Sequence, residues 1–326
     1  MTNRPKRENS FERDLVVAAY QVILGRDPES EAVINEKIDH FRTPSELLSD
    51  FVNAPESRFK KADFADEVNK GYGRPLNGIE VDVSKEVFDA MFDRVREQWS
   101  ALGEIDPYWS VLSHDRFRMK SIEGSKEEFY ASGASSDRII DIFAQRCEIV
   151  VPQGTCLELG CGVGRITRYL ANRFQKVIGV DISEGNLNLA RDYLNAEMLS
   201  GHVDLMLLRD LRQIEDLSGI DFFYSVIVLQ HNPPPLMAEI LRVVFGKLRP
   251  GGAFLFQVPT HTPGYKFSSK DYLASRDPVG EDFEMHALPM HKILDIIANA
   301  GAQPKEVLLD MATGGYGSHT FFGVKN

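Results

Sequence analysis

The sequence predicts an α/β fold in which helices cover both faces of a mainly parallel sheet. Short apolar runs alternate regularly with amphipathic patterns from Thr155 onward. Residues 222–228, FFYSVIV, are almost continuously apolar, as expected for a parallel strand buried on both faces. The first apolar run ends in glycines and the second in an acid, a pattern typical of nucleotide-binding βαβ units. We therefore expect a doubly wound sheet.

The expected strands and helices follow one another in order along the second half of the chain. Parallel strands are predicted at residues 155–159, 176–180, 202–208, 222–228 and 253–258. Helices are predicted at about residues 165–173, 184–198, 234–247 and 289–300. A glycine-rich turn between residues 306–311 and 319–324 predicts a closing antiparallel hairpin. The sheet should then have seven strands.

A small all-helical module is predicted at the N-terminus, within residues 1–62. Apolar positions recur at helical spacing from Phe11, and Gly25 supplies a helix stop. A second helix is expected to begin at Asp27. Thr43 is the predicted N-cap of a third helix, because a proline follows it and an acid stands three residues later.

Residues 63–115 are predicted to be a glycine-broken linker followed by a helical lid segment. Ser84–Leu102 carries apolar residues about one turn apart and should be helical. Tyr108 and Trp109 either line the cleft or pack in the core. Residues 127–147 predict one more helix, which belongs to a third region, residues 116–326.

Residues 155–181, TCLELGCGVGRITRYLANRFQKVIGVD, carry the strongest functional signal. The alternate glycines Gly160, Gly162 and Gly164 permit a tight turn, and they let a ligand lie directly against the backbone. Asp181 should stand at the carboxyl end of the second strand, where a carboxylate can accept both hydroxyls of a ribose. The stretch therefore predicts a nucleotide-like ligand.

The residues around the glycines separate two classes of ligand. A dinucleotide site would need a third glycine at Arg165, and Glu158 would repel a pyrophosphate. An acid in this position suits a cationic ligand with an amino group and a sulfonium. The stretch resembles the E-x-G-x-G-x-G motif and the second acidic motif of class I S-adenosylmethionine-dependent methyltransferases. With the closing hairpin, the resemblance covers about residues 150–326.

This resemblance implies S-adenosyl-L-methionine as the cofactor and methyl transfer as the activity. By position, the cofactor contacts should also include Ile182 after the second strand. Asp210 and Leu211 follow the third strand, where the family usually places an acid on the adenine amino group. Val228 follows the fourth strand and should lie against the methionine end.

Three histidines on expected loops of the same rim are candidates for catalysis: His231, His261 and His286. A histidine with a near-neutral pKa can accept the proton of an acceptor hydroxyl. His231 is the preferred base because it follows the fourth strand, and the other two could hold the acceptor. Hydrogen-bonded structural roles and metal binding are the alternatives, although no metal ligand is predicted.

The prolines after His231 could also suggest an amino-group methyltransferase. That family carries an asparagine–proline–proline–aromatic motif, whereas Asn232 is followed here by three prolines ending at Pro235. An aromatic fourth residue is missing. We therefore expect the prolines to open the next helix, where a missing amide donor costs nothing.

Composition narrows the possible partners and the compartment. The chain has 326 residues and a net charge of −11, which argues against nucleic acid as a partner. It has no apolar stretch of membrane-spanning length and no signal-peptide pattern, so a cytoplasmic location is expected. The cysteines Cys147, Cys156 and Cys161 lack metal-ligand spacing and are expected to be buried thiols.

The N-terminal phrases LGRDPES and FVNAPESRF resemble a bacterial domain of unknown function, over about residues 11–60. That family occurs beside enzymes of surface glycans and in secreted proteins. The expected activity is O-methyl transfer to a small-molecule or saccharide acceptor, and the saccharide choice rests on this resemblance alone. The alternatives are an N- or C-methyltransferase of the same fold, and a non-catalytic adaptor that binds a protein partner through the module.

Overall fold

The computed structural model describes residues 9–41, 43–54, 56–57, 78–262, 264–275, 283–310, 312 and 317–326, with side chains from residue 13 onward. The contacts divide the chain into two units, Met1–Gly73 and Arg74–Asn326. The predicted linker lies outside the described residues up to residue 77. The remainder of the predicted lid segment belongs to the second unit, so the boundaries at residues 62 and 115 stay predictions.

The first unit is built from α1 (Asn9–Ala19), the short π-helix η1 (Tyr20–Leu24), α2 (Glu31–His40) and α3 (Pro44–Asn53). Gly25 ends η1 with φ 73°, and the Thr43 hydroxyl accepts the Glu46 amide at 3.2 Å, as the sequence predicts. The second helix begins at Glu31 instead of Asp27, because the Ser30 side chain caps it. Buried side chains from all of these helices form one small core.

In the second unit, helices precede the sheet: α5 (Lys85–Ile105), α6 (Pro107–Val111), η3 (Asp115–Phe117), η4 (Ile122–Gly124), α7 (Lys126–Ala131) and α8 (Gly133–Arg146). The long helix α5 begins at its Ser84 cap, close to its predicted start. The helical stretch predicted at about residues 127–147 is confirmed, except that it is divided at Ser132 into α7 and α8. The break lets Gly133 approach so closely that a Cβ there would lie 2.3 Å from the Arg165 carbonyl oxygen.

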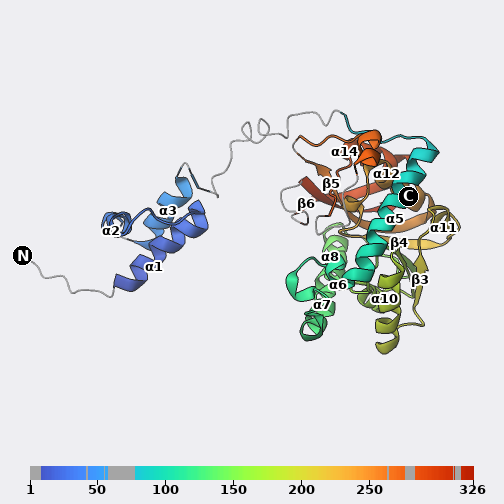
Figure 1. The fold of residues 1–326 in the computed structure, drawn as a ribbon, viewed down its shortest axis with the longest axis horizontal. Coiled ribbons are helices and arrows are strands. Elements are labelled where there is room, and N and C mark those ends of the chain that lie inside the picture. Colours follow the sequence, from blue (N-terminus) through green and yellow to red (C-terminus); the bar gives the residue numbers. More distant parts are fainter. Residues whose placement is uncertain are drawn as a thin grey trace, which may run out of the picture. The chain divides into compact units, whose positions relative to one another are not determined.

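The sheet has seven strands in the order β3-β2-β1-β4-β5-β7-β6, and Figure 1 labels β3, β4, β5 and β6. The strands are β1 (Thr155–Leu159), β2 (Lys176–Asp181), β3 (Val203–Leu207), β4 (Ile220–Ser225), β5 (Leu248–His261), β6 (Ala302–Asp310) and β7 (Gly317–Lys325). β1 to β5 pair in parallel, and β7 pairs antiparallel with both β5 and β6. The predicted doubly wound sheet with its closing hairpin is confirmed. The turn predicted between residues 311 and 317 lies almost entirely outside the described residues.

Seven further helices complete the second unit: α9 (Thr167–Arg173), α10 (Glu184–Ala196), α11 (Arg212–Glu215), η5 (Leu229–His231), α12 (Pro234–Lys247), α13 (Ser269–Ala274) and α14 (Met290–Asn299) within the described part. The prolines open α12, as predicted. In the described residues, no helix is both long and apolar enough to cross a bilayer.

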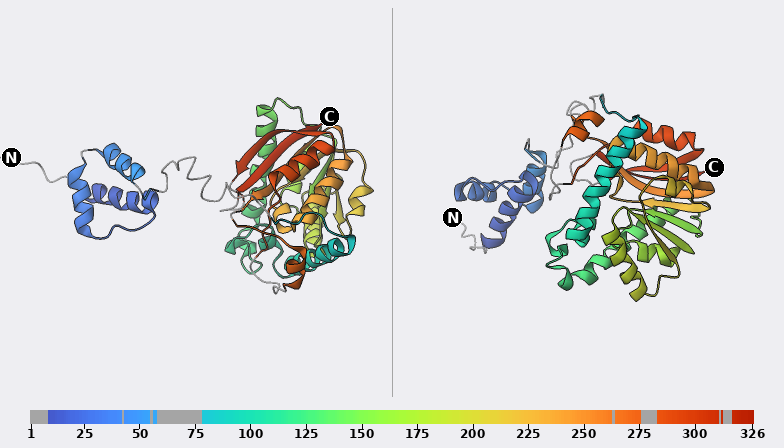
Figure 2. Two further views of the ribbon diagram at one scale, coloured as in Figure 1. Left: turned by 90° about the horizontal axis from the view of Figure 1, so that it is seen from above. Right: turned by 45° about the vertical axis from the view of Figure 1, so that its right-hand side comes forward.

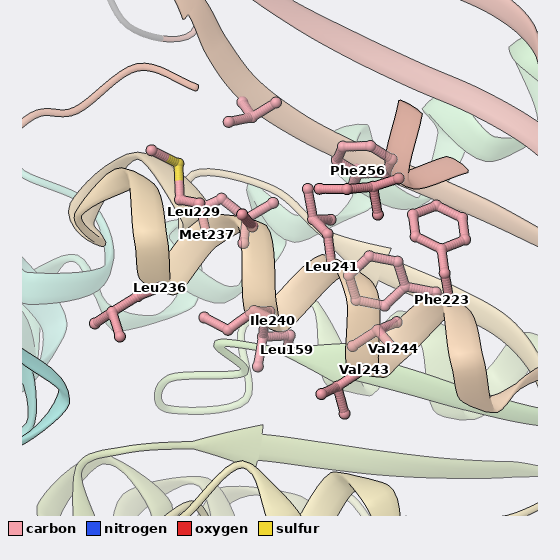
Figure 3. Close-up of a cluster of buried hydrophobic side chains, with 14 of the residues drawn as sticks. Leu159, Phe223, Leu229, Leu236, Met237, Ile240, Leu241, Val243, Val244 and Phe256 are labelled. Carbon is pink, nitrogen blue, oxygen red and sulfur yellow. The ribbon is translucent and has the colours of Figure 1, made fainter. Parts of the chain in front are cut away.

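Helices lie on both sides of the sheet (Figure 2). The side chains of the central strands β1 and β4 are buried on both faces, which explains why these strands are so apolar. On one face, Phe223 and Phe256 pack against α12, and Figure 3 shows Leu241 and Val244 of that helix beside them. On the other face, alternate strand residues such as Phe222 pack with α8 and α9. This alternation fixes the sheet and leaves the carboxyl ends of its parallel strands to form a site.

The fourth strand ends earlier than its sequence predicts. β4 ends at Ser225 instead of Val228, because Ile227 adopts a left-handed backbone conformation with φ 60°. An extended strand cannot continue through such a residue. Residues 226–228 therefore form a turn at the carboxyl edge of the sheet.

Candidate active site

A cavity opens where the carboxyl ends of β1, β2 and β4 meet the helices α5 and α6. Ser110 and Val111 of α6 and Trp99 of α5 contribute to its wall. Among the residues predicted from the sequence, the cavity is lined by Glu158, Gly160, Gly162, Asp181, Ile182, Val228 and His231. The structure therefore brings most of the predicted site together at one point.

The glycine turn after β1 is left-handed at each of its three glycines, with φ 73° at Gly160, 54° at Gly162 and 85° at Gly164. A Cβ on Gly160 would lie 2.3 Å from a methyl carbon of Val228, and one on Gly162 would lie 2.5 Å from Val111. Side chains at these two positions would thus need both a strained backbone and displaced neighbours. Gly164 has ordinary space around it and does not line the cavity.

Asp181 organises the glycine turn directly, a role that its sequence position did not reveal. One carboxylate oxygen accepts the Gly162 amide at 2.8 Å, and the other accepts the Ser183 amide at 2.9 Å at the start of α10. Burial raises the pKa of this carboxyl, although these backbone donors oppose the change. The Ile182 backbone and the Asn186 side chain also hydrogen-bond to this carboxylate, so the oxygens of Asp181 already serve donors of the protein itself.

Glu158 supplies a buried negative charge to the cavity. The residue is 2% exposed, and its Oε2 has no hydrogen-bond partner within the described part of the chain. Burial raises the pKa of this carboxyl to about 7, from an ordinary value of 4.5. An unpaired buried carboxylate oxygen is costly, and a ligand ammonium group would remove that cost.

Arg165 also lines the cavity, where the sequence analysis had used it only to exclude a dinucleotide site. Its guanidinium is largely buried and donates to the Ser132 hydroxyl at 3.2 Å. Burial lowers the pKa of this group. Glu158 and Arg165 thus place opposite charges in one cavity, which suits a ligand with both an ammonium and a carboxylate group.

His231 lines the same cavity and is held in one protonation state. Its Nδ1 lies 3.1 Å from the Glu284 carbonyl oxygen. A carbonyl can only accept, so Nδ1 carries the hydrogen and Nε2 of the neutral ring keeps a free lone pair. Burial lowers the pKa of His231 to about 4, below the near-neutral value expected from the sequence. The ring is therefore neutral at physiological pH, and it is a weaker base than the sequence predicts.

His286 lies behind His231 and belongs to a polar network that fixes the Glu284 segment. Its Nδ1 lies 2.7 Å from the Tyr265 hydroxyl, and its Nε2 lies 3.5 Å from a carboxylate oxygen of Glu284. Arg94 of α5 donates to the other oxygen of that carboxylate. Burial alone would raise the pKa of Glu284, but His286 and Arg94 more than offset it and lower the value. The network therefore fixes the Glu284 segment, whose carbonyl oxygen in turn orients the His231 ring.

The other predicted residues lie away from the cavity. His261 ends β5 opposite Gly317 of β7, and Leu211 is buried in the core beside α12. Asp210 borders a separate surface depression and pairs with Arg212, which holds the pKa of that carboxyl at about 2. Its predicted contact with adenine stays a prediction. In the described part of the chain, no three His, Cys, Asp or Glu side chains cluster closely enough to hold a metal.

Aromatic side chains form one wall beside His231. The Trp99 ring centroid lies 4.9 Å from that of His231, and Phe283 stacks on both Trp99 and Trp109. Tyr108 and Trp109 are buried and do not line the cavity, so the core-packing alternative describes them. In the sequence, Trp99 is one of the apolar residues on the helix predicted at Ser84–Leu102, and nothing there assigns it to the site. The signal that could have found it is that the chain has just two tryptophans.

Residues 156–252 match a family model described as "Methyltransferase domain". A probable fatty acid methyltransferase of Pseudomonas putida is 34% identical over 97 residues, which are 29% of this chain and 24% of the relative. A ubiquinone biosynthesis O-methyltransferase of Acinetobacter baylyi is 27% identical over 41% of this chain and 52% of its own length. The chain thus spans between a quarter and about half of the length of these curated relatives.

Among solved structures, the magnesium protoporphyrin IX methyltransferase of Synechocystis with bound SAH is similar, with a TM-score of 0.50 and 17% identity. The match covers 73% of this chain and 100% of that one. The same enzyme with bound SAM also has a TM-score of 0.50, over 76% of this chain and 100% of that one. At such identity the likeness shows the fold alone. The family match and the order of the strands together identify residues 156–252 as part of a class I, S-adenosyl-L-methionine-dependent methyltransferase domain.

Proposed function

We propose that the protein binds S-adenosyl-L-methionine in this cavity and transfers its methyl group to a hydroxyl of a small molecule, with His231 as the general base. One observation carries the proposal. A neutral histidine and an unpaired buried carboxylate line the same cavity as the glycine turn. The histidine can accept the proton of an acceptor hydroxyl. The carboxylate can accept hydrogen bonds from the ammonium group of the cofactor.

The residues of the cavity fit the cofactor by chemistry. The unpaired Oε2 of Glu158 offers an acceptor to the amino group, and Arg165 offers a partner to the carboxylate. Gly160 and Gly162 leave room that a side chain would fill. Asp181 lines the same cavity at the end of β2, where its carboxylate is the acceptor for ribose hydroxyls. When bound, the cofactor supplies an electrophilic methyl group on a sulfonium.

The remaining work falls to residues of this chain. Methyl transfer to oxygen is an in-line displacement, so much of the catalysis consists of holding the acceptor in place. Nε2 of His231 accepts the acceptor's proton, and the Glu284 carbonyl continues to bind the Nδ1 hydrogen of the resulting imidazolium. Trp99 closes one side of the cavity with an apolar face.

The class of acceptor is part of the proposal. A relative named as an O-methyltransferase supports oxygen as the methylated atom. A saccharide acceptor is supported by the resemblance of the N-terminal module alone. A screen of saccharides, nucleotide sugars and phenols for methyl transfer tests this choice. Methylation of amines or carbon acids alone would favour the N- or C-methyltransferase alternative.

Calorimetric titration with S-adenosylhomocysteine and NAD in parallel tests the proposal itself. We expect the protein to bind S-adenosylhomocysteine at micromolar concentrations and not to bind NAD, because Glu158 lies where a pyrophosphate would have to approach. Binding of NAD alone would overturn the proposal. Binding of neither ligand would favour the non-catalytic adaptor.

We predict that the affinity for S-adenosylhomocysteine falls as the pH is lowered through 7. Glu158 has a pKa of about 7 in the free protein, and a bound ammonium favours its ionised form. Protonation of Glu158 therefore competes with the ligand below pH 7, and this competition disappears above about pH 8. At pH 5.5 only about one carboxyl in thirty is ionised, so the expected loss is up to about 30-fold. Calorimetry in two buffers of different ionisation enthalpy would count the protons released.

The variant Glu158→Gln is the control for this pH dependence. The glutamine side chain has nearly the same shape as glutamate but cannot ionise. Any effect of the ligand's own titration therefore remains in the affinity-versus-pH profile of this variant. The difference between the two profiles isolates Glu158. If both proteins show the same fall in affinity between pH 8 and 5.5, Glu158 does not bind the ammonium group.

A further inference from the structure

Ile227 has an unusual backbone conformation for its side chain. Within the described part of the chain, three residues other than glycine have positive φ: Glu148, Met198 and Ile227. Left-handed angles are strained for any side chain and most of all for a β-branched one. Met198 is 88% exposed, far from the cavity lining, whereas Ile227 lines the cavity itself. Strain of this kind persists only where the surroundings enforce it.

Two buried polar side chains enforce the conformation of Ile227. Its amide donates to Oε1 of Gln257 at 2.9 Å, and the Gln257 amide group donates to the Ser318 hydroxyl. Gln257 and Ser318 are both fully buried. The backbone amide can only donate, which fixes which end of the Gln257 side chain faces Ile227. β5 and β7 thus hold the chain just beyond β4.

This turn sets the positions of two parts of the site. Val228, the next residue, packs its methyl groups into the space over Gly160. The Val228 carbonyl then accepts the His231 amide at 3.1 Å and the Asn232 side chain at 3.0 Å. An extended residue 227 would carry Val228 away from the glycine turn. The spacing between the glycine turn and His231 therefore depends on the conformation of Ile227.

We propose that Gln257 is a positioning residue, which together with Ser318 holds Ile227 in its left-handed conformation and so sets the spacing between the cofactor-binding glycine turn and His231. Gln257 itself does not line the cavity. The inference rests on the proposed function in one respect, because its main probe is the cofactor product S-adenosylhomocysteine. It predicts that the hydrogen bond between the Ile227 amide and Gln257 is needed to hold the left-handed conformation only while residue 227 has a side chain.

A double-mutant cycle with Gln257→Leu and Ile227→Gly tests this. In the parent background, Q257L should weaken S-adenosylhomocysteine binding by about tenfold or more, because residue 227 relaxes towards an extended conformation. In the I227G background the same change should cost less than about threefold, because glycine adopts positive φ unaided. If Gln257 only supported packing, its loss would cost the same in both backgrounds. Equal costs, or no cost in the parent, would overturn the proposal.

The variant Met198→Gly is the matched control, since it removes the backbone strain of another residue with positive φ, one that lies on the surface. Q257L should cost as much in the M198G background as in the parent. If Q257L does not fold, Ser318→Ala takes its place in the same cycle, because it leaves the Gln257 amide group without its acceptor. Thermal melts of every variant accompany the titrations.

A second measurement needs no ligand and separates this inference from the proposed function. The chain's two tryptophans lie beside the site, and Trp99 contacts His231. Q257L should raise iodide quenching of tryptophan fluorescence, and I227G should restore the parent value. A parent that fails to bind S-adenosylhomocysteine would refute the proposed function, yet this cycle would still decide the role of Gln257. If iodide quenching in the double variant stays as high as in Q257L alone, Gln257 does not have the proposed positioning role.

Discussion

Replacing Gly160 by alanine is expected to reduce the affinity for S-adenosylhomocysteine by at least about 100-fold while leaving the protein folded. The residue has φ 73°, and a left-handed alanine costs roughly 1–2 kcal/mol. The new Cβ would also lie 2.3 Å from a methyl carbon of Val228, so the turn after β4 must move. Every loss of about 1.4 kcal/mol in binding free energy lowers the affinity tenfold. Calorimetry would measure the loss, with a thermal melt beside it.

Gly219→Ala separates the clash from the backbone strain. Gly219 has φ 69°, but a Cβ there would meet no atom within 4 Å. This control should therefore lower the melting temperature slightly and leave the affinity unchanged. An unchanged affinity in Gly160→Ala as well would mean that the glycine turn does not contact the cofactor.

The second large effect is expected for His231→Ala. Loss of a general base typically lowers kcat by about 10²–10⁴-fold, whereas the affinity for S-adenosylhomocysteine should change little. Burial holds the pKa of His231 at about 4, so its base form is present at every pH above about 5. The parent's kcat at saturating cofactor should therefore be flat between pH 5.5 and 8. Single-turnover assays with an acceptor from the screen would measure both quantities.

His202→Ala is a suitable control, because His202 is exposed and only its Nδ1 contacts the Gln175 carbonyl. It should turn over like the parent. If His231→Ala does the same, the proton leaves by another route, and His231 serves only to end η5.

The sheet and the residues that line the cavity beside the glycine turn could be predicted because both depend on local patterns. Alternating apolar runs set the strands, and three glycines with a following acid set the turn. The end of β4 could not be predicted this way. Val226, Ile227 and Val228 all favour strands, and the contact that overrides them comes from Gln257, thirty residues later.

Side-chain pairing explains the other differences. Asp210 follows β3, as an adenine-binding acid would, but Arg212 binds its carboxylate on the protein surface. His286 follows a loop on the same rim as His231, but Tyr265 and Glu284 engage it in a network behind the cavity. Sequence spacing predicts that a residue lies at an edge of the sheet, but only the folded structure shows which side chains it hydrogen-bonds or pairs with.

The position of β7 has a consequence for how the protein is made. β7 follows β6 in the sequence, yet it lies between β5 and β6 in the sheet. During synthesis, β6 leaves the ribosome before the strand that must join it to β5. Until β7 emerges, β5 presents an unpaired edge, and such edges invite pairing with other chains. We expect a nascent chain stalled before Gly317 to depend on a chaperone, and one released after Lys325 to complete its sheet unaided.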